Sequence, residues 1–239
     1  MKTRQTLTVG DERFRIGPWH ASRETAYLAV PPDGPRPTAD GLRSCVARIA
    51  ESGYTSIITS ALHPHEASAF LATGFEEYDR LVVLSHVLSE LDPPRPALSS
   101  EVRLRRARQR DRPEALEVDG RAFRSFWRLD GPGLHEAESA TPVSRFRVAE
   151  RGGMVIGYAV TGRAGGQGFL QRLATDPDVA GSGVGSALTV DALRWAARRR
   201  AHRVLVNTQR QNTRAIELYR RLGFTMTRND LVVLTRSIP

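Results

Sequence analysis

The stretch GFLQRLATDPDVAGSGVGSAL, residues 168–188, determines how the second half of this sequence is expected to fold. It begins with an apolar, strand-like run containing Phe169, Leu170 and Leu173, continues through Asp-Pro-Asp, and then places three glycines at alternate positions. A long helical pattern over residues 183–200 follows. The stretch therefore predicts a strand, a glycine-rich loop and a helix in that order.

The glycine-rich loop is compatible with two interpretations. Glycines lack a Cβ atom, so their N–H groups can converge on an anion, and the start of a helix adds unpaired N–H groups and a positive dipole end. Three glycines can equally form a tight turn between a strand and a helix. Two nucleotide motifs are excluded, because Ser186 and Ala187 replace the Lys and Ser/Thr of a P-loop and Leu188 replaces the third glycine of the dinucleotide fingerprint.

The composition is that of a basic chain that can form a packed core. The 239 residues are 40% hydrophobic and carry a formal charge of +9, almost wholly from arginine because Lys2 is the sole lysine. Arginines gather in residues 103–110 and 198–200, but no recognition-helix pattern accompanies them, so we expect no nucleic-acid partner. Cys45 is the sole cysteine, which excludes a disulfide within the chain and a cysteine metal site, and no metal is expected.

No run of apolar residues is long enough to span a bilayer, and residues Lys2 and Arg4 near the start do not resemble a signal peptide. We therefore expect a cytoplasmic protein without a membrane partner, either a monomer or a homodimer.

Hydrophobic periodicity divides the chain into two segments in which strands and helices alternate. Residues 91–100, LDPPRPALSS, lack periodicity and are predicted to be a linker between a first half, 1–90, and a second half, 101–239. The first half is predicted to contain strands at 13–16, 26–30, 54–59 and 81–84, a helix from about residue 40 to Gly53, and a helix at 66–73. The second is predicted to contain strands at 102–107, 146–150, 154–161, 168–175, 203–207 and 231–234, helices from Asp111 and at 183–200 and 212–222, and an irregular stretch at 123–141.

Two segments of the chain resemble each other without a gap. Residues 55–75 can be aligned with residues 204–224, and both segments end in Gly-Phe. Two copies of one strand-helix-strand unit are the natural explanation.

The two copies differ where chemistry would be expected. Phe70 in the first copy stands at the position of Tyr219 in the second, and His63 stands at the position of Asn212. The proline-rich residues 31–37 lie where the glycine loop would fall, and prolines offer no N–H groups to an anion. We therefore expect that the first copy has lost a site that the second retains.

In two sequence motifs, the second half resembles the GNAT superfamily of acyl-CoA N-acyltransferases. The family's pyrophosphate loop, [Q/R]-x-x-G-x-[G/A], is matched by residues 180–185 except that Ala180 replaces the polar first residue. A second signature, N-x-x-A-x-x-x-Y-x-x-x-G-F, is matched in full by Asn212, Ala215, Tyr219, Gly223 and Phe224. The resemblance covers residues 102–236, and the internal repeat extends a weaker version of it to the first half.

The resemblance implies a fold and an activity. The fold is α/β (α+β), with a mixed, mostly antiparallel sheet, splayed central strands at 170–175 and 204–207, flanking helices, and two GNAT-like units of which the first is degenerate. The implied activity is transfer of the acetyl group of acetyl-CoA to a primary amine by direct attack. The acceptor stays open between a protein N-terminus, as in the ribosomal-protein alanine acetyltransferases that the second half resembles, and a small molecule, as in the mycothiol synthases that the two-copy layout resembles.

The resemblance also implies roles for individual residues. Tyr219 is the expected general acid, and the backbone N–H of Ala174 is the expected donor to the carbonyl oxygen. The residues expected to bind acetyl-CoA lie on the splayed strands, the glycine loop and the last helix: Leu173, Ala174, Thr175, Gly181, Ser182, Gly183, Val184, Gly185, Ser186, Asn207, Asn212 and Tyr219.

Several residues are candidates for contact with the acceptor, and several for the general base. The candidates for acceptor contact are Phe126, Trp127, Asp130, Gln171 and Gln209. Where many family members carry a glutamate on the strand before the loop, this chain has Gln171 and Arg172. The base could be Asp130, His135, Glu136, Glu138 or a chain of waters, and the alternative function is a sensor or scaffold that binds acyl-CoA without turnover.

Overall fold

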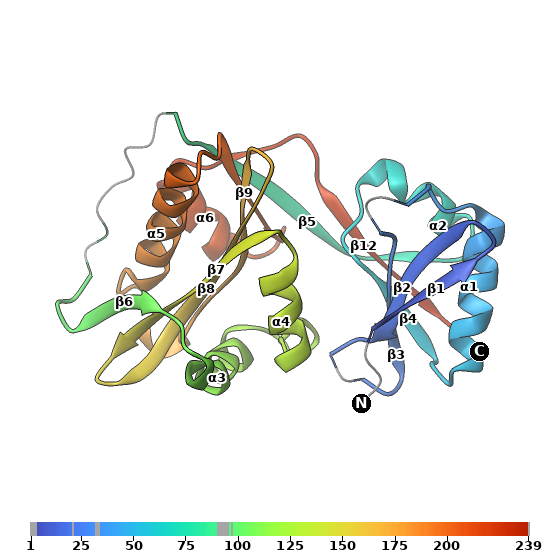
Figure 1. The fold of residues 1–239 in the computed structure, drawn as a ribbon, viewed down its shortest axis with the longest axis horizontal. Helices are drawn as coiled ribbons and strands as arrows, with labels where there is room; N and C mark the ends of the chain where they lie inside the picture. The colour runs from blue at the N-terminus through green and yellow to red at the C-terminus, as the bar shows by residue number, and fades with distance from the viewer. Residues whose placement is uncertain (1–3, 21, 32–33, 90–95, 97, 239) are drawn as a thin grey trace. The chain divides into compact units, whose positions relative to one another are not determined.

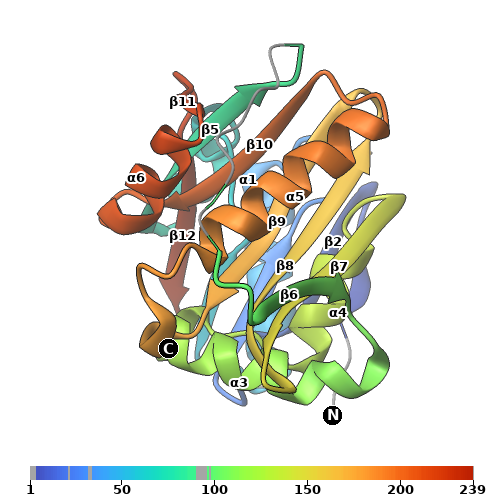
Figure 2. The same ribbon diagram turned by 90° about the vertical axis from the view of Figure 1, so that its left-hand side faces the viewer.

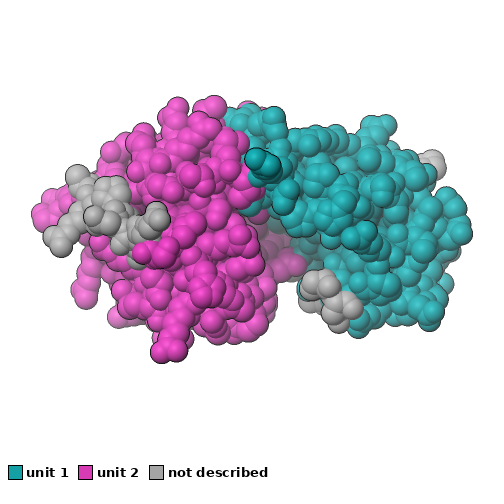
Figure 3. Space-filling model, turned by 90° about the horizontal axis from the view of Figure 1, so that it is seen from above, with its two compact units in different colours: residues 1–83, 209–211, 228–239 teal, residues 84–208, 212–227 magenta. Residues whose placement is uncertain are grey.

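The computed structural model describes residues 4–20, 22–31, 34–89, 96 and 98–238 of the chain. It forms two compact units, shown in the ribbon and space-filling views of Figures 1 and 3. Unit 1 comprises Met1–Val83, Gln209–Gln211 and Arg228–Pro239, and unit 2 comprises Leu84–Thr208 and Asn212–Thr227.

This division corrects the expected boundary between residues 1–90 and 101–239. The last strand of the chain lies in unit 1 because it pairs on both sides with strands from the first half. The predicted linker, 91–100, falls largely outside the described residues.

Unit 1 is a mixed sheet with two helices. Its strand order is β1-β2-β3-β4-β12-β5, in which β3 and β4 are parallel and the other pairs are antiparallel. Its elements are β1 (Gln5–Val9), β2 (Glu12–Pro18), β3 (Thr25–Ala29), α1 (Ala39–Glu51), β4 (Ser56–Thr59), α2 (Ser68–Leu71), the first part of β5 (Glu76–Val87) and β12 (Leu231–Ser237). A short 3-10 turn, Pro64–Glu66, precedes α2.

Helix α1 follows directly from its sequence. The hydroxyl of Thr38 accepts a hydrogen bond from the N–H of Gly41 at 3.0 Å, which caps the helix start. Its apolar residues recur every three or four positions and are buried against the sheet: Leu42, Cys45, Val46 and Ile49. Burial among these side chains raises the pKa of the Cys45 thiol to about 12, so it stays protonated.

Unit 2 contains most of the elements expected from the second half. Its strand order is β5-β10-β9-β8-β7-β6, with β11 beside β5 (Figure 2). Its elements are the last part of β5, β6 (Val102–Arg106), α3 (Arg112–Ala122), α4 (Gly131–Ser139), β7 (Val143–Arg151), β8 (Met154–Ala164), β9 (Gln167–Thr175), α5 (Val184–Arg198), β10 (Arg203–Gln209), α6 (Thr213–Arg221) and β11 (Thr225–Met226). Short 3-10 turns occupy Gln109–Asp111, Ser125–Trp127 and Pro177–Val179.

Helices cover both faces of the unit 2 sheet. Along β7, Phe146 and Val148 are buried in a cluster with residues of α3 and α4, whereas Arg145 and Arg147 contact Asp191 of α5. Because successive strand residues point to opposite faces, α5 and the α3–α4 pair lie on opposite sides. Figures 1 and 2 show the same layering. The fold is the expected α/β class with a mostly antiparallel sheet.

The two aligned segments, 55–75 and 204–224, end in the same local geometry. Gly74 and Gly223 both have left-handed φ values, +83° and +85°. The aromatic residue five positions before each Phe packs against it, with ring centroids 5.3 Å apart for Phe70 and Phe75 and 5.5 Å apart for Tyr219 and Phe224. The equivalent residues of the two copies therefore form the same turn and ring pair.

Three local predictions differ from the structure. Residues 123–141, predicted to be irregular, contain the whole of α4. The helix predicted at 66–73 is a 3-10 turn and one short helix, and β1 was absent from the prediction. Helix α4 begins after the side chain of Asp130, which accepts from the N–H of Gly133 at 2.8 Å, and Pro132 lies in its first turn. None of the described helices has both the length and the apolar composition needed to cross a bilayer.

Candidate active site

Strands β9 and β10 of unit 2 separate from each other. Their parallel pairing joins Arg203, Val204 and Leu205 to residues 167–169, and within the described chain it goes no further. Beyond it, β9 continues to Thr175 and β10 to Gln209. The two strands thus splay apart at the position that the sequence predicts, and backbone groups of β9 there have no strand partner on the β10 side.

A β-bulge decides which N–H groups of β9 face this gap. The register against β8 passes from Leu170 opposite Thr161 to Arg172 opposite Val160, so Gln171 is the extra residue. After the bulge, the N–H of Asp176 donates to the carbonyl of Ile156 at 3.0 Å.

Antiparallel ladders alternate between residues that bond across the pair and residues that do not. The bond from Asp176 fixes this alternation along β9. The N–H of Ala174, two residues earlier, points toward Tyr158 of β8, and the N–H groups of Leu173 and Thr175 point into the gap. The N–H of Ala174, which the resemblance places at the reacting carbonyl, therefore faces β8. Leu173 and Thr175 are the residues of β9 that offer N–H groups to the gap.

The glycine loop connects β9 to α5 and presents unpaired N–H groups. Gly181 and Gly183 have φ values of +79° and +83°, and Gly183 occupies the N-cap position of α5. Among the described residues no hydrogen bond uses the N–H groups of residues 183–186, as expected for the first turn of a helix. The N–H of Ser182, another residue of the expected cofactor site, is already engaged, because it donates to the carbonyl of Val179 at 3.2 Å.

Asn212 begins the last helix as its N-cap. Its Oδ1 accepts from the N–H of Ala215 at 3.2 Å, and its Nδ2 donates to the hydroxyl of Thr208 at 3.1 Å. Sequence reasoning predicted a contact with the cofactor and overlooked this capping role. One N–H of the amide group remains for a ligand.

Tyr219 lies two turns later in α6 and is 4% exposed. Burial raises the pKa of its phenol, and the positive charge of Arg172 opposes this rise. The phenol is therefore protonated at neutral pH. Its hydroxyl makes no hydrogen bond within the described part of the chain, which leaves the proton for a ligand.

A buried carboxylate that the sequence analysis did not single out lies beside the bulge. Asp119 of α3 is fully buried and accepts two hydrogen bonds from Arg172, each at 2.8 Å. It also accepts from the hydroxyl of Tyr158 at 2.5 Å and from the N–H of Leu129 at 2.7 Å. Arg172 in turn donates to the carbonyl of Trp127 at 2.7 Å. The cluster ties α3 to β8 and to β9 directly before Leu173.

The sequence did contain a signal for Asp119. Ala115, Val118, Asp119 and Ala122 have the spacing of one helix face, and Ala115 and Val118 are buried. A carboxylate on an apolar helix face must find partners, and Arg172 and Tyr158 are those partners. Burial raises the pKa of Tyr158, so that this phenol remains a donor to Asp119.

The residues predicted for acceptor contact have different environments. The side chain of Gln171 donates weakly to Thr141 at 3.3 Å, while its Oε1 is buried without a partner among the described residues. Phe126 and Trp127 pack edge to face with centroids 5.1 Å apart. Asp130 caps α4, and Gln209 groups with unit 1.

Two other expectations concern polar residues near these elements. Asn207, predicted to bind the cofactor, is exposed near the end of β10. Glu138, a candidate base, forms an ion pair with Arg112, whereas His135 is exposed. No group of three or more potential metal ligands occurs in the part of the chain that the structure describes.

Comparisons with known proteins agree with this architecture. Residues 104–224 match the family described as "Acetyltransferase (GNAT) family". A protein named mycothiol acetyltransferase from Saccharomonospora viridis is 33% identical over 70% of this chain and 60% of its own length. Another of that name, from Thermobispora bispora, is 30% identical over 87% of this chain and 78% of its own length.

A solved structure described as a tandem GNAT protein from the clavulanic acid biosynthesis pathway has the same fold. Its TM-score is 0.68 at 15% identity, covering 95% of this chain and 78% of that chain. The chain spans about 60% of the length of the first two curated relatives it matches. This chain belongs to the acetyltransferase (GNAT) family.

Proposed function

We propose that this chain is an N-acetyltransferase that transfers the acetyl group of acetyl-CoA to a primary amine. The observation that carries the proposal is the gap between β9 and β10. In unit 2 the N–H groups of Leu173 and Thr175 face this gap, and the glycine loop follows where β9 ends. The same unit contains the protonated phenol of Tyr219.

The residues present fit coenzyme A. Its pyrophosphate needs convergent donors, and the N–H groups of residues 183–186 are unpaired at the positive end of α5. An added Cβ at Gly181 would meet nothing within 4 Å, so the loop is open on that side. Leu173 and Thr175 would hold the extended arm by strand-like hydrogen bonds, and the free N–H of Asn212 would add a further contact.

The chemistry that these residues support is a direct transfer. Acetyl-CoA supplies an acetyl thioester. Leu173 offers its N–H to the carbonyl oxygen, where negative charge develops as the amine attacks. The C–N bond would form as the C–S bond breaks, and Tyr219, which is protonated at neutral pH, would donate its proton to the departing sulfur. The proton that the amine loses would pass through water and restore the phenol. Arg172 and Asp119 hold the backbone that carries Leu173.

The acceptor class that we favour is a small-molecule amine. Proteins that are similar to this chain over most of its length are named mycothiol acetyltransferase. An amine of the mycothiol type is therefore the first acceptor to test. Free peptide N-termini form the second class.

The test is thiol release from acetyl-CoA by the purified chain with a panel of amines. The panel contains amino sugar conjugates, polyamines and peptides with free N-termini. We expect release above the rate without acceptor for one class, with an acetylated product of the matching mass. Tight coenzyme A binding without any acetylated product would contradict catalysis.

One observation favours a second function, an acyl-CoA sensor without turnover. The strand position where many family members carry a glutamate holds Gln171 and Arg172, and Arg172 is bound to Asp119. Asp130 and Glu138, two of the candidate bases, are engaged in a helix cap and an ion pair. Binding of acetyl-CoA that leaves the thioester intact with every acceptor would support this function.

A further inference from the structure

A basic hollow opens in unit 2 away from the glycine loop. It has a volume of about 460 Å³ and is lined by the turn after β6, the start of β7 and the C-terminal half of α5. We call it the arginine hollow, because six arginines line it among the described residues: Arg106, Arg108, Arg112, Arg145, Arg147 and Arg199. Helix α5 has 15 residues, so about 22 Å separate its N-terminus, with the glycine loop, from its C-terminal end.

The hollow lies at the open edge of the sheet. Strand β6 pairs with β7 from Arg151 back to Arg147, and the N–H of Ala107 then donates to the carbonyl of Phe146 at 3.0 Å. The first residues of β7 therefore have no strand partner on this side within the described chain. Both faces of β7 contribute to the lining, with Phe146 from one and Arg145 and Arg147 from the other.

The positive charges in the hollow exceed the carboxylates that balance them. Asp191 accepts from Arg145 at 2.5 Å and from Arg147 at 3.1 Å, and Glu138 pairs with Arg112. Arg106, Arg108 and Arg199 form no ion pair with any residue that the structure describes. Three guanidinium groups thus remain for an external anion.

Burial, and to a smaller extent neighbouring positive charge, opposes the protonated state of Arg145. Burial, followed by repulsion from Arg147 and Arg198, lowers its pKa to about 10, although Asp191 acts in the opposite direction. Its guanidinium also lies over the ring of Trp195, with 5.3 Å between Cζ and the ring centroid. An anion in the hollow would reduce this repulsion.

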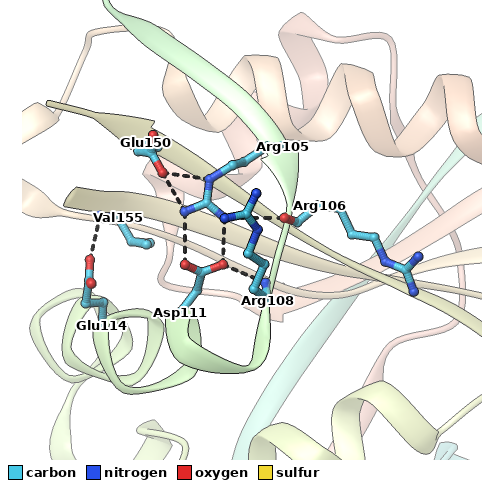
Figure 4. A network of polar contacts seen from close by, with 7 residues as sticks. All are labelled: Arg105, Arg106, Arg108, Asp111, Glu114, Glu150 and Val155. Atoms are coloured by element: carbon cyan, nitrogen blue, oxygen red, sulfur yellow. Dashed lines mark hydrogen bonds and ion pairs between the residues drawn. The ribbon is translucent and has the colours of Figure 1, made fainter. Parts of the chain in front are cut away.

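The backbone between the end of β6 and the start of α3 carries Arg106, Arg108 and Arg112. A separate network of polar contacts holds it in place (Figure 4). Arg105 makes two hydrogen bonds to the buried Asp111, at 2.6 and 2.9 Å, and one to Glu150 at 2.6 Å. Asp111 also accepts from the N–H of Arg108 at 2.6 Å. Figure 4 shows the side chain of Arg106 pointing away from this network. The turn between β6 and α3 is therefore fixed while its neighbouring arginines stay available.

We propose that the arginine hollow binds a small molecule with two or more phosphate-type anionic groups. Planar guanidinium groups match the oxygens of phosphate by paired hydrogen bonds, and several of them converge here without enough carboxylates. The volume lies in the range of small-ligand sites, which favours a compact polyanion over a nucleic-acid strand. The site is independent of acetyl transfer.

The test uses inorganic tripolyphosphate as the probe and calorimetry as the readout, with and without saturating coenzyme A. The variants Arg108→Ala and Arg199→Ala remove exposed arginines of the hollow. The controls Arg103→Ala and Arg151→Ala remove exposed arginines on β6 and β7 that do not line it. We expect about a tenfold loss of affinity for each hollow variant and about a hundredfold loss for the double variant. The controls should stay within about twofold.

Several results would overturn the proposal. Absence of binding would do so, as would an equal loss in hollow and control variants, because this would indicate attraction to net charge alone. Displacement of the probe by coenzyme A would place it at the glycine loop. Tighter binding of a DNA duplex than of tripolyphosphate, lost in the same variants, would replace the small ligand with a nucleic acid. Coenzyme A affinity of the hollow variants should equal that of the wild type, which separates this test from the proposed acetyl transfer.

Discussion

The ion pair between Asp119 and Arg172 should behave as one unit when it is mutated. The carboxylate is fully buried and the side chain of Arg172 is 15% exposed, so removal of either partner leaves a charge in a site with little water. Breaking buried pairs of this kind destabilises proteins by about 3–5 kcal/mol. We therefore expect Asp119→Asn and Arg172→Met each to lower the free energy of unfolding of unit 2 by about 3 kcal/mol.

The double variant distinguishes this reasoning from a simple loss of contacts. If the two charges are coupled, Asp119→Asn combined with Arg172→Met should cost about 2 kcal/mol less than the sum of the single variants. Urea unfolding followed by tryptophan fluorescence is a suitable assay, because Trp127 and Trp195 both lie in unit 2. Additive effects within about 0.5 kcal/mol would refute the coupling.

An ion pair that is exposed on both sides provides a control. Arg43 and Asp40 of α1 form an ion pair, and their side chains are 57% and 89% exposed. Exposed pairs contribute about 0–1 kcal/mol, so Arg43→Met should cost less than about 1 kcal/mol. Equal costs for Arg43→Met and Arg172→Met would show that burial does not decide the effect.

Three further predictions concern the glycine loop, the β6–α3 turn and unit 1. Gly183→Ala forces a left-handed φ of +83° on alanine and should weaken coenzyme A binding in calorimetry, whereas Gly153→Ala, with the same strain at φ +84° in the β7–β8 turn, should leave that affinity unchanged. The ion pair with Arg105 lowers the pKa of Asp111 from 3.8 to about 2, so it stabilises the fold by about 2 kcal/mol above pH 4, and the difference between wild type and Asp111→Asn in urea unfolding should shrink as the pH falls from 4 toward 2. Thr38→Ala removes the cap of α1 and should cost about 1 kcal/mol in thermal unfolding, while Thr38→Ser should cost a few tenths.

Local signals in the sequence predicted the elements around the site. Gly183 and Gly223 adopt the left-handed φ values that a loop and a helix end require, and apolar spacing located β9, α5, β10 and α6 around them. The resemblance to the family added Tyr219 and the splay between β9 and β10. The glycine turns and the elements depend on neighbours in the sequence, and each was predicted near its observed position. The splay joins distant strands, and only the resemblance predicted it.

Features that depend on distant partners were missed. The bulge at Gln171 appears only when β9 is placed beside β8, and it is what turns the N–H of Ala174 away from the gap. The placement of β12 in unit 1, away from the rest of the second half, depends on its pairing with β4 and β5. Helix α4 was missed for a different reason, because Gly131 and Pro132 resemble a loop unless Asp130 is read as a cap.

The measurement that tests the central claim most directly is the turnover of Tyr219→Phe with acetyl-CoA and the best acceptor of the panel. Loss of a general acid lowers turnover by about a hundredfold or more, and the phenyl ring keeps the packing against Phe224. We expect such a loss with coenzyme A affinity within about twofold of the wild type, and no change for Tyr54→Phe in unit 1. Unchanged turnover in Tyr219→Phe would contradict the assignment of the acid and, with it, this account of the site.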